Sequence, residues 1–338
     1  MRSACRYALQ MDCGVFRLDR ETAAFPDPRD KQVLIKVSAA SLNYRDLLIM
    51  SDSTTKAGLV PLSDAAGAVI ATGENVTRWK SGDRVCPNFF PAWLDGRFST
   101  DYLSQTLGGG QTDGVLSELI LADEASLTAI PENLTFNEAA TLPCAGLTAW
   151  HALFERGIVQ PGATVLVQGT GGVALFALQL ATAAGAKVIV TSSSDDKLRR
   201  AEALGAWRTI NYRSRPNWDE AALEYTEGKG VDYILELGGA DTYERSISAI
   251  AAGGHIAQIG VLSGFAAQPN IRPLQFKNAD IHGICVGSAA QFQRLADFVK
   301  KHNIRPVIDR VFDFAEAPSA YEYLKSAKHF GKVIISVS

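Results

Sequence analysis

The stretch ATVLVQGTGGVALFALQLATAAGAKVIVTS, residues 163–192, contains the signal that decides the fold. Its apolar run at Ala163–Gly169 predicts a buried strand, Val173–Gly185 predicts an apolar helix, and Lys187–Ser192 predicts a second strand. Two strands joined through a helix are the unit from which parallel sheets are built. The stretch therefore predicts an α/β fold.

The turn between the first strand and the helix has the pattern of a phosphate-binding loop. Gly169, Gly171 and Ala174 fill the positions of G-x-G-x-x-G/A. Gly169 permits the tight turn, Gly171 lets the backbone approach a pyrophosphate, and Ala174 keeps the helix close to the strand. The first N–H groups of the helix would face the phosphates. A plain glycine turn is the alternative, but the strand–loop–helix–strand context favours a dinucleotide site.

The end of the second strand indicates which dinucleotide binds. NAD sites usually place Asp or Glu there, on the ribose 2′-hydroxyl. Here the small hydroxyl residues Thr191–Ser193 occupy this place, and none of them would repel a 2′-phosphate. Lys197 could pair with that phosphate, and Tyr212 and Arg213 could reach it. We therefore predict NADP(H) over NAD(H), with a solvated surface lysine as the alternative for Lys197.

The rest of the chain divides into two rhythms. From about Asn137 onward, strands alternate with helices, which predicts a doubly wound parallel sheet. Before about residue 131, short apolar runs are separated by Gly and Pro, which predicts a small barrel or sandwich. The main further elements that we expect are strands at Gln32–Ser41, Ala66–Gly73, Ser81–Pro87, Gly114–Ala122, Val231–Gly239, His255–Gly260 and Asp280–Gly287, and helices at Tyr44–Met50, Asp195–Gly205 and Ala240–Gly254.

Two features of the first part leave their roles open. The helix at Tyr44–Met50 is expected to turn Leu47, Leu48 and Ile49 inward. The long segment Phe89–Gly110 contains Phe90, Trp93, Phe98 and Tyr102. These aromatic side chains either line a substrate pocket under a mobile lid or pack the loop onto the domain.

Composition excludes several classes of protein. The 338 residues are 47% hydrophobic and 20% charged with a formal net charge of −3, so no basic surface for nucleic acid is expected. No window offers the roughly 18 apolar residues of a membrane helix, and the first residues lack an apolar run of signal-peptide length. Cys5, Cys13, Cys86, Cys144 and Cys285 are scattered and form no C-x-x-C pair, which argues against disulfides and a zinc lobe. The cytoplasm is the expected compartment.

Several segments, in order along the chain, carry a resemblance to a known family. They are SLNYRDLL, GDRV, GGGQTDGVLSELI, IPENLTFNEAATLPCAGLTAWHAL, the phosphate-loop stretch and its continuation to INYR, and the closing GKVIISV. Together they span nearly the whole chain. The chain resembles the medium-chain dehydrogenase/reductase superfamily, and is most similar to the zinc-independent branch that includes NADPH quinone oxidoreductases.

The resemblance implies an architecture and a set of cofactor residues. It implies a GroES-like β-barrel catalytic domain at residues 1–135, a Rossmann cofactor domain at 136–288, and a segment at 289–338 that rejoins the catalytic domain, with the active site in the cleft. Many relatives dimerise through the edge of the Rossmann sheet, here Asp280–Gly287. The cofactor-binding residues that we predict are Asn43, Thr148, Gly169, Thr170, Gly171, Gly172, Val173, Ser192, Ser193, Lys197, Tyr212, Gly260, Val261, Cys285 and Val286.

The resemblance also identifies where zinc is bound in the alcohol dehydrogenases of the superfamily. Asn43 stands at the position of the first Cys ligand, Ser63 at the His, and Asp64 at the following Glu. Only Cys144 keeps its ligand type, whereas a catalytic zinc needs three protein ligands. We therefore predict no metal, and Cys144 as a packed residue. Ser63 and Asp64 either touch the substrate or hold the segment that begins at Asn43.

Without zinc, fixed hydrogen-bond donors must stabilise the negative charge that hydride attack leaves on a substrate oxygen. By position the candidates are Asn43, Arg45 and Ser63, with Tyr44 and Asp46 beside them. The tyrosine that quinone oxidoreductases carry further along this helix is replaced by Leu48, so the proton donor does not transfer. A salt bridge to Asp46 or Asp64 is the alternative role of Arg45.

Three functions follow for this combination of an intact cofactor loop and a lost metal site. The first is an NADPH-dependent reductase of small quinones, enones or related activated carbonyls, acting as a homodimer without nucleic-acid or membrane partners. The second is an alcohol or aldehyde dehydrogenase that works without zinc. The third is an NADPH-binding protein with little turnover.

Overall fold

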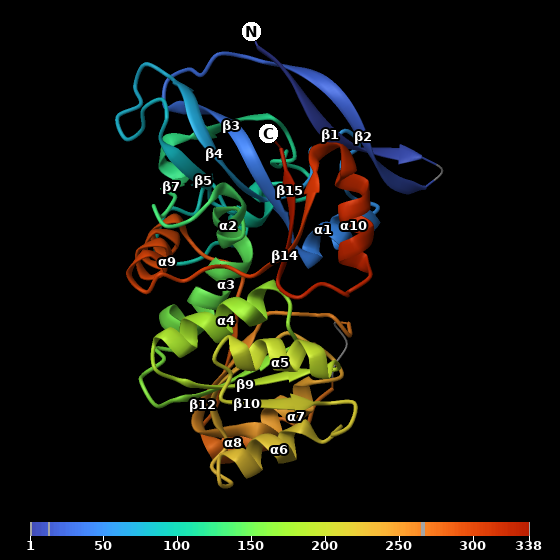
Figure 1. The fold of residues 1–338 in the computed structure, drawn as a ribbon, viewed down its shortest axis with the longest axis vertical. Coiled ribbons are helices and arrows are strands. Elements are labelled where there is room, and N and C mark those ends of the chain that lie inside the picture. The colour runs from blue at the N-terminus through green and yellow to red at the C-terminus, as the bar shows by residue number, and fades with distance from the viewer. Residues whose placement is uncertain (1, 13, 265–267, 338) are drawn as a thin grey trace. The chain divides into compact units, whose positions relative to one another are not determined.

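The computed structural model describes residues 2–12, 14–264 and 268–337, so Cys13 lies outside the described residues. The chain forms two compact units, Met1–Leu147 with Val286–Ser338, and Thr148–Cys285 (Figure 1). The first boundary lies twelve residues after the predicted 135/136, because helix α2 (Phe136–Ala139) packs against the first unit's strands. The last 53 residues return to that first unit.

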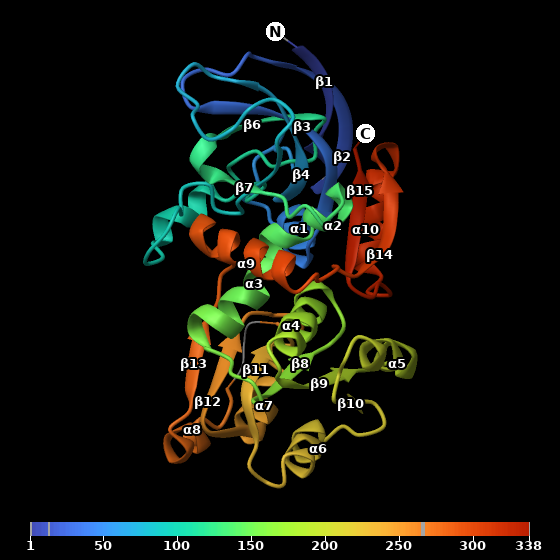
Figure 2. The same cartoon turned by 60° about the vertical axis from the view of Figure 1, so that its left-hand side comes forward.

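The second unit is built on a six-stranded parallel sheet. Its strand order is β10-β9-β8-β11-β12-β13. Its strands are β8 (Thr164–Gln168), β9 (Lys187–Ser192), β10 (Arg208–Asn211), β11 (Val231–Glu236), β12 (Ile250–Gln258) and β13 (Asp280–Gly283). Its helices include α4 (Gly172–Ala183), α5 (Asp195–Ala203), α6 (Trp218–Tyr225), α7 (Tyr243–Ala249) and α8 (Arg272–Lys277). Numbered from β8, the order is 3-2-1-4-5-6, the dinucleotide-binding arrangement, with its switch point between β8 and β11 (Figure 2).

Burial explains why the opening stretch forms the centre of this sheet. Val165, Leu166 and Val167 of β8 are buried on both faces, as a central parallel strand requires. Helix α4 is apolar along nearly its whole length and contacts β8 and β9. Ala174 is buried in its first turn, where a larger side chain would separate helix and strand.

One predicted helix is shorter than expected. The sequence suggested a helix over Ala240–Gly254, but α7 ends at Ala249 and the chain continues directly as β12. Ile250 pairs with Val231 of β11, and Gly253 has a φ of 71°, which an α-helix cannot accommodate. Strand pairing therefore prevailed over the helical pattern at this point.

The first unit contains a seven-stranded sheet and a two-stranded hairpin. The sheet has the order β14-β15-β3-β4-β5-β7, with β6 paired to β3. Its strands are β3 (Gln32–Leu42), β4 (Asp64–Thr72), β5 (Arg84–Pro87), β6 (Leu119–Asp123), β7 (Leu127–Ala129), β14 (Ile308–Asp313) and β15 (Lys332–Ser336); the hairpin is β1 (Arg2–Asp12) and β2 (Val15–Phe25). Its helices include α1 (Tyr44–Ser51), α9 (Ala289–Lys301) and α10 (Ala317–Lys325). Strand β3 lies between β4 and β15, so the end of the chain completes the centre of this sheet.

Helix α1 differs from expectation in the face that it buries. Its only fully buried residue is Asp46, whereas Leu48 is 37% exposed and Leu47 and Ile49 are half-buried. Successive helical residues are about 100° apart, so three consecutive side chains cannot all point inward. The helix therefore buries the Asp46 carboxylate and packs Leu47 and Ile49 against the core, whereas Leu48 faces outward.

The aromatic residues of the Phe89–Gly110 segment pack on one another. The ring of Trp93 contacts Phe98 at 5.0 Å between centroids and stacks on Tyr102 at 6.1 Å, and Phe90 contacts Phe98 at 5.6 Å. Trp93 is only 2% exposed. The structure thus shows these rings packed on one another, and their role in lining a substrate pocket stays a prediction.

No helix within the described ranges is long and apolar enough to cross a membrane. Of the helices described above, α9 is the longest with 13 residues and α4 has 12. A bilayer span needs about 20 residues.

Candidate functional site

A buried polar cluster forms in the first unit where β3 ends between its two neighbours. Asn43 follows β3 and precedes α1, and its backbone N–H donates to Asp46 Oδ2 at 2.7 Å. Asparagine before a helix and aspartate three residues into it are favoured residues at these positions. The cap holds the Asn43 backbone, and with it the start of α1, in place.

Lys332 completes this cluster, and sequence reasoning missed it. Val333 of β15 pairs with Leu42 of β3, which places Lys332 beside Asn43. Its Nζ donates to the Leu42 carbonyl at 2.6 Å and to Asn43 Oδ1 at 2.5 Å, and the residue is only 3% exposed. In the sequence, Lys332 lies within the closing segment GKVIISV, and the residues around it give no sign of a contact with Asn43.

On the other side of β3, Ser63 and Asp64 form a closed arrangement. Ser41 of β3 pairs with Asp64 of β4. The Ser63 hydroxyl donates to Asp64 Oδ1 at 2.6 Å, and the Cys144 backbone N–H donates to Asp64 Oδ2 at 3.1 Å. Both residues are fully buried. Within the first unit, the pair therefore holds the chain around β4 and Cys144, as a structural cap does.

The charges of the cluster shift its titrating groups. Burial raises the pKa of Asp64, while the Lys332 ammonium and the Ser63 hydroxyl act in the opposite direction. Burial also raises the pKa of the Cys144 thiol well above its usual value, so this thiol stays protonated, as a packed cysteine does. Burial raises the pKa of Asp46 to about 6, despite the opposing charge of Arg45 and the N–H of Asn43.

The Arg45 guanidinium is engaged by the neighbouring loop. It donates to the carbonyls of Leu107 at 2.9 Å and Gly108 at 3.1 Å, and it lies over the ring of Phe89 at 4.8 Å. Its distance to Asp46 Oδ1 is 3.7 Å. Arg45 thus forms the salt bridge to Asp46 that the sequence left open as its alternative role. Its hydrogen bonds to the two carbonyls also tie α1 to the aromatic segment.

Several buried donors in and around the cluster have no acceptor among the described residues: Asn43 Nδ2 and the hydroxyls of Ser41 and Tyr321. Asn43 is 9% exposed, and its Nδ2 makes no hydrogen bond to any described residue. The amide lies near enough to Asp64 to lower the pKa of that carboxyl, but not with hydrogen-bond geometry. Because buried donors in native proteins normally have partners, the Asn43 N–H is available to bind an oxygen of a ligand.

The cluster does not suit the zinc ion of the wider family. Of the residues at the ligand positions, Asn43 and Ser63 offer neutral oxygens, their oxygen atoms are occupied by Lys332 and Asp64, and only Cys144 is a thiol. Structural and catalytic zinc sites use Cys, His, Asp or Glu. Among the described residues of this cluster, no three such groups come together. A buried ammonium, that of Lys332, also lies within it.

In the second unit, the glycine loop leaves room for a ligand at the start of α4. Gly169 has a φ of 79°, which favours glycine, and its N–H donates to the Thr191 carbonyl at 2.8 Å. A Cβ atom added at Gly171 would meet no heavy atom within 4 Å, so the protein itself leaves this space empty. Thr170 lies in the same loop, and Gly172 and Val173 form the first turn of α4. This geometry fits a bound pyrophosphate.

The residues predicted to recognise the 2′-phosphate lie at or just after the ends of two adjacent strands, β9 and β10, and in the first turn of α5. Ser192 is buried at the end of β9, and its carbonyl accepts the N–H of Tyr212, the residue after β10. Ser194 caps α5 by accepting the backbone N–H of Lys197 at 3.4 Å. Tyr212 is 42% exposed, and Ser193 and Lys197 are half-buried. The structure brings Ser192 and Tyr212 together and places Lys197 on the first turn of the helix beside them.

A buried carboxylate at the end of β11 was also missed from the sequence. Glu236 is fully buried and accepts hydrogen bonds from Gln168 Nε2 at 2.7 Å, Gly239 N–H at 2.9 Å and Ser246 Oγ. The Gln168 carbonyl oxygen in turn accepts the N–H groups of residues 237 and 238. This network shapes the loop after β11, which leaves the sheet at the same carboxyl ends of the strands as the glycine loop after β8. The only sequence signal was an acidic residue in an apolar strand.

The remaining predicted cofactor residues divide between the two units. Gly260 follows β12, and its N–H donates to the Glu236 carbonyl at 2.9 Å; Val261 comes next. Thr148 is buried in the second unit, to which Cys285 also belongs. Val286 belongs to the first unit, as does Asn43, and has an unusual φ of 50° for a β-branched residue.

Family models match both parts of the chain. Residues 29–132 match the alcohol dehydrogenase GroES-like domain, and residues 172–301 match the zinc-binding dehydrogenase family. The first match contains β3 to β7 of the first unit, and the second runs from the start of α4 to the end of α9.

Known proteins align over almost the full length. The chain is 44% identical to a zinc-type alcohol dehydrogenase-like protein of Schizosaccharomyces pombe, over 90% of this chain and 91% of that protein. It is 31% identical to a quinone oxidoreductase of Pseudomonas aeruginosa, over 91% of this chain and 92% of that protein. A crystal structure from Sinorhizobium meliloti, provisionally named an alcohol dehydrogenase, has a TM-score of 0.94 and 41% identity, covering all of both chains.

Proposed function

Because the chain belongs to the medium-chain dehydrogenase/reductase superfamily, a family of nicotinamide-dependent oxidoreductases, we propose that it is an NADPH-dependent reductase of quinones, enones or related activated carbonyls that works without zinc. The observation that carries this proposal is the polar cluster of the first unit. At the family's metal position it holds Asn43 and a buried ammonium, Lys332, in place of three zinc ligands.

The residues at the ends of β9 and β10 support NADPH over NADH. Ser192 and Ser193 stand where a carboxylate would repel the 2′-phosphate, and Lys197 and Tyr212 lie beside them. Gly169 and Gly171 would hold the pyrophosphate against the N-terminus of α4. When bound, NADPH supplies the hydride.

The first unit would supply the hydrogen bond to the substrate oxygen. Reduction adds a hydride and one proton to the substrate, and negative charge develops on its oxygen before the proton arrives. Asn43 Nδ2 is a buried donor of the cluster without a partner among the described residues. Lys332 donates to the oxygen of the same amide, which polarises it and makes its N–H a stronger donor. In this role a fixed amide and a buried cation act where relatives use a metal.

Steady-state kinetics test the reaction class. Chelator-treated protein is assayed with NADPH against a panel of quinones, enones and aldehydes, and with NADP⁺ against alcohols, and its metal content is measured. We expect turnover of quinones or enones that chelator and added Zn²⁺ leave unchanged. Activity that chelator abolishes and Zn²⁺ restores would refute the zinc-free proposal.

The same panel separates the two other functions. Chelator-resistant turnover of alcohols or aldehydes, without turnover of quinones or enones, would identify a dehydrogenase that works without zinc. Tight NADPH binding without substrate-dependent oxidation would identify a binding protein with little turnover.

The cofactor preference has its own experiment. Lys197→Ala is compared with Lys229→Ala, an exposed lysine of the same unit that lies 3.9 Å from Glu227. Loss of one charged hydrogen bond to the phosphate should weaken NADPH binding by about 10- to 100-fold and leave NADH unchanged. Equal weakening of both cofactors would show that Lys197 does not contact the 2′-phosphate.

We also propose a homodimer in the cytoplasm. Strand β13 is the outer strand of its sheet and, among the described residues, pairs with β12 alone. Cys5, Cys86 and Cys144 are free thiols, as a reducing compartment would keep them. Light scattering after size exclusion tests the dimer, and a single-chain mass at micromolar concentration would exclude it.

A further inference from the structure

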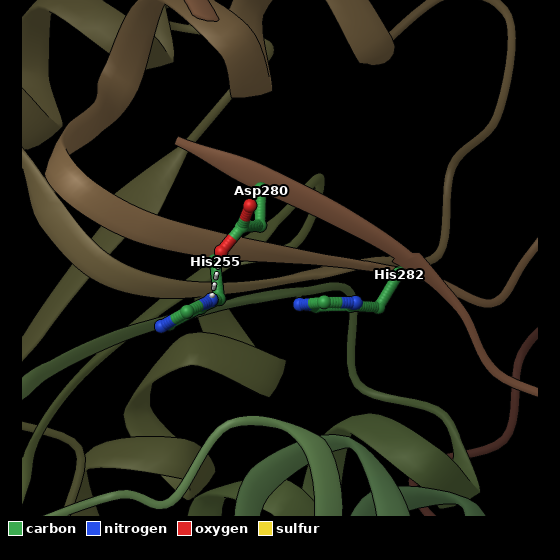
Figure 3. A group of neighbouring side chains, drawn as sticks. All are labelled: His255, Asp280 and His282. Atoms are coloured by element: carbon green, nitrogen blue, oxygen red, sulfur yellow. Dashed lines mark ion pairs between the residues drawn. The ribbon is translucent and has the colours of Figure 1, made fainter. Parts of the chain in front are cut away.

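Two histidines and an aspartate share one face of the outer strands of the second unit. His255 of β12 pairs in register with Asp280 of β13, and Ala257 pairs with His282. Because side chains at i and i+2 of a strand point to the same face, His282 lies on the same side as the other two. Figure 3 shows the three side chains close together, with the ring of His282 pointing toward His255.

The ligand atoms of this group are near one another. One nitrogen or carboxylate oxygen from each residue lies within 4.8 Å of the others, and His255 Nδ1 is 3.3 Å from Asp280 Oδ2. The two imidazole rings stack at 5.7 Å between centroids. His255 Nδ1 is buried and, within the described part of the chain, accepts or donates no hydrogen bond of normal geometry. The nitrogen lies beside the Asp280 carboxylate but is not hydrogen-bonded to it.

We propose that His255, Asp280 and His282 bind a divalent transition-metal ion of the Zn²⁺ type, with the remaining coordination position open to water. Imidazole nitrogens with one carboxylate are ligands that Zn²⁺, Co²⁺ and Ni²⁺ accept, whereas Ca²⁺ and Mg²⁺ prefer oxygen alone. Tetrahedral zinc with bonds of about 2.0–2.2 Å separates its ligand atoms by roughly 3.4 Å. Small side-chain rotations would therefore close the group around an ion.

Arg156 is the natural competitor of the metal. Its guanidinium lies 3.1 Å from His282 Nδ1. Arginine can only donate, so Nδ1 is the acceptor and the ring proton is on Nε2. Because Arg156 is exposed, it can turn away when an ion takes its place beside the imidazole.

None of the residues of this site is among the predicted catalytic or cofactor-binding residues. All its residues and Arg156 lie in the Thr148–Cys285 unit, whereas the family's metal position, represented by Asn43 and Ser63, lies in the other unit. Its occupancy does not depend on the proposed function, and an ion here would join β13 to β12 at the outer side of the sheet.

Metal titration of the full-length, tag-free protein tests the proposal. After chelator treatment, Zn²⁺ is titrated by calorimetry and Co²⁺ by visible absorption. We expect one ion per chain and cobalt bands of a tetrahedral or five-coordinate site. His255→Gln and His282→Gln should each weaken binding by about 100-fold, since each ligand carries a large share of the affinity. His302→Gln is the control, because this exposed histidine stacks on Phe298 in the other unit.

The substitution of Arg156 gives a result of the opposite sign. Arg156→Gln removes the competing cation, so Zn²⁺ should bind several-fold more tightly, although a mainly structural arginine would give no gain. If one of the two histidine variants does not fold, Asp280→Asn is tested in its place. NADPH binding by each variant shows whether the Thr148–Cys285 unit is still folded. The proposal is overturned if no stoichiometric ion binds, if the histidine or aspartate variants keep wild-type affinity, or if Arg156→Gln weakens binding.

Discussion

Replacing Lys332 by methionine removes the buried cation of the polar cluster while keeping a side chain of similar length. The variant loses two hydrogen bonds from a charged donor, to the Leu42 carbonyl and Asn43 Oδ1, each of which contributes about 1.5–3 kcal/mol. It also leaves the Asp64 carboxylate buried without the ammonium that now favours its charged form. Methionine regains part of this by burying apolar surface. We expect a net loss of about 3–4 kcal/mol, within the range for breaking a buried charge pair.

The loss should depend on pH in a defined direction. Without Lys332 the pKa of Asp64 rises further, so its folded-state pKa lies further above the unfolded value. A group whose pKa is raised in the folded state stabilises the protein at low pH, and this stabilisation is lost as the pH increases through the folded-state pKa. The difference between wild type and Lys332→Met should therefore be larger at pH 8 than at pH 5. Asp64→Asn removes the charge and should recover part of the loss in the double variant.

Calorimetry and urea unfolding measure these effects. For a unit of this size, about 3–4 kcal/mol corresponds to roughly 6–16 °C in the transition of the first unit. Lys36→Met is the matched control, because Lys36 is exposed on β3 and should change stability by less than about 0.5 kcal/mol. The reasoning is refuted if Lys332→Met costs less than about 1 kcal/mol, or if its cost is the same at both pH values and Asp64→Asn does not reduce it.

Three further results follow from the same sites. The pKa of Asp46 is about 6 in the folded protein against an ordinary value of 3.8, so the protonated form of Asp46 favours folding. As the pH rises from 4 to 7, the stability of the wild type should therefore fall by up to about 3 kcal/mol relative to that of Asp46→Asn. Plots of stability against pH that run parallel for the two proteins would contradict this assignment. Gly171→Ala should fold with unchanged thermal stability, because its Cβ meets no atom, yet weaken NADPH binding at least about tenfold by blocking the pyrophosphate; Gly283→Ala, equally unhindered, should change neither. Asn43→Ala should lower kcat by about 100-fold or more if Nδ2 binds the developing oxyanion, and a change confined to KM would argue against that role.

Most of the second unit could be predicted from short segments. A strand that runs through glycines into an apolar helix specifies its own local geometry, because the positive φ of Gly169 and the small Ala174 act on immediate neighbours. The hydroxyl residues at the end of β9 needed only the position of that strand. The prediction was wrong where an element ended: Ile250 left the helix because its strand partner, Val231, lies elsewhere in the chain.

The polar cluster of the first unit could be predicted only in part. The pattern of Asn43 and Asp46 at a helix start is local, and the structure has it as a cap. The sequence also indicated that Ser63 and Cys144 stand at lost metal positions. The direction of Asp46 inward and of Leu48 outward depends on what the helix packs against, and three successive apolar residues do not reveal that.

The sequence by itself thus determined the parallel sheet and the glycine turn before α4, because each depends on neighbouring residues, and it predicted that three zinc ligands are missing from the family's metal position. Only the tertiary structure decided what fills that position. Lys332 reaches Asn43 across 289 residues because β15 pairs with β3, and His255 meets Asp280 and His282 because β12 pairs with β13. Strand pairing is set by the packing of whole sheets, so contacts between distant residues are not encoded in any one segment.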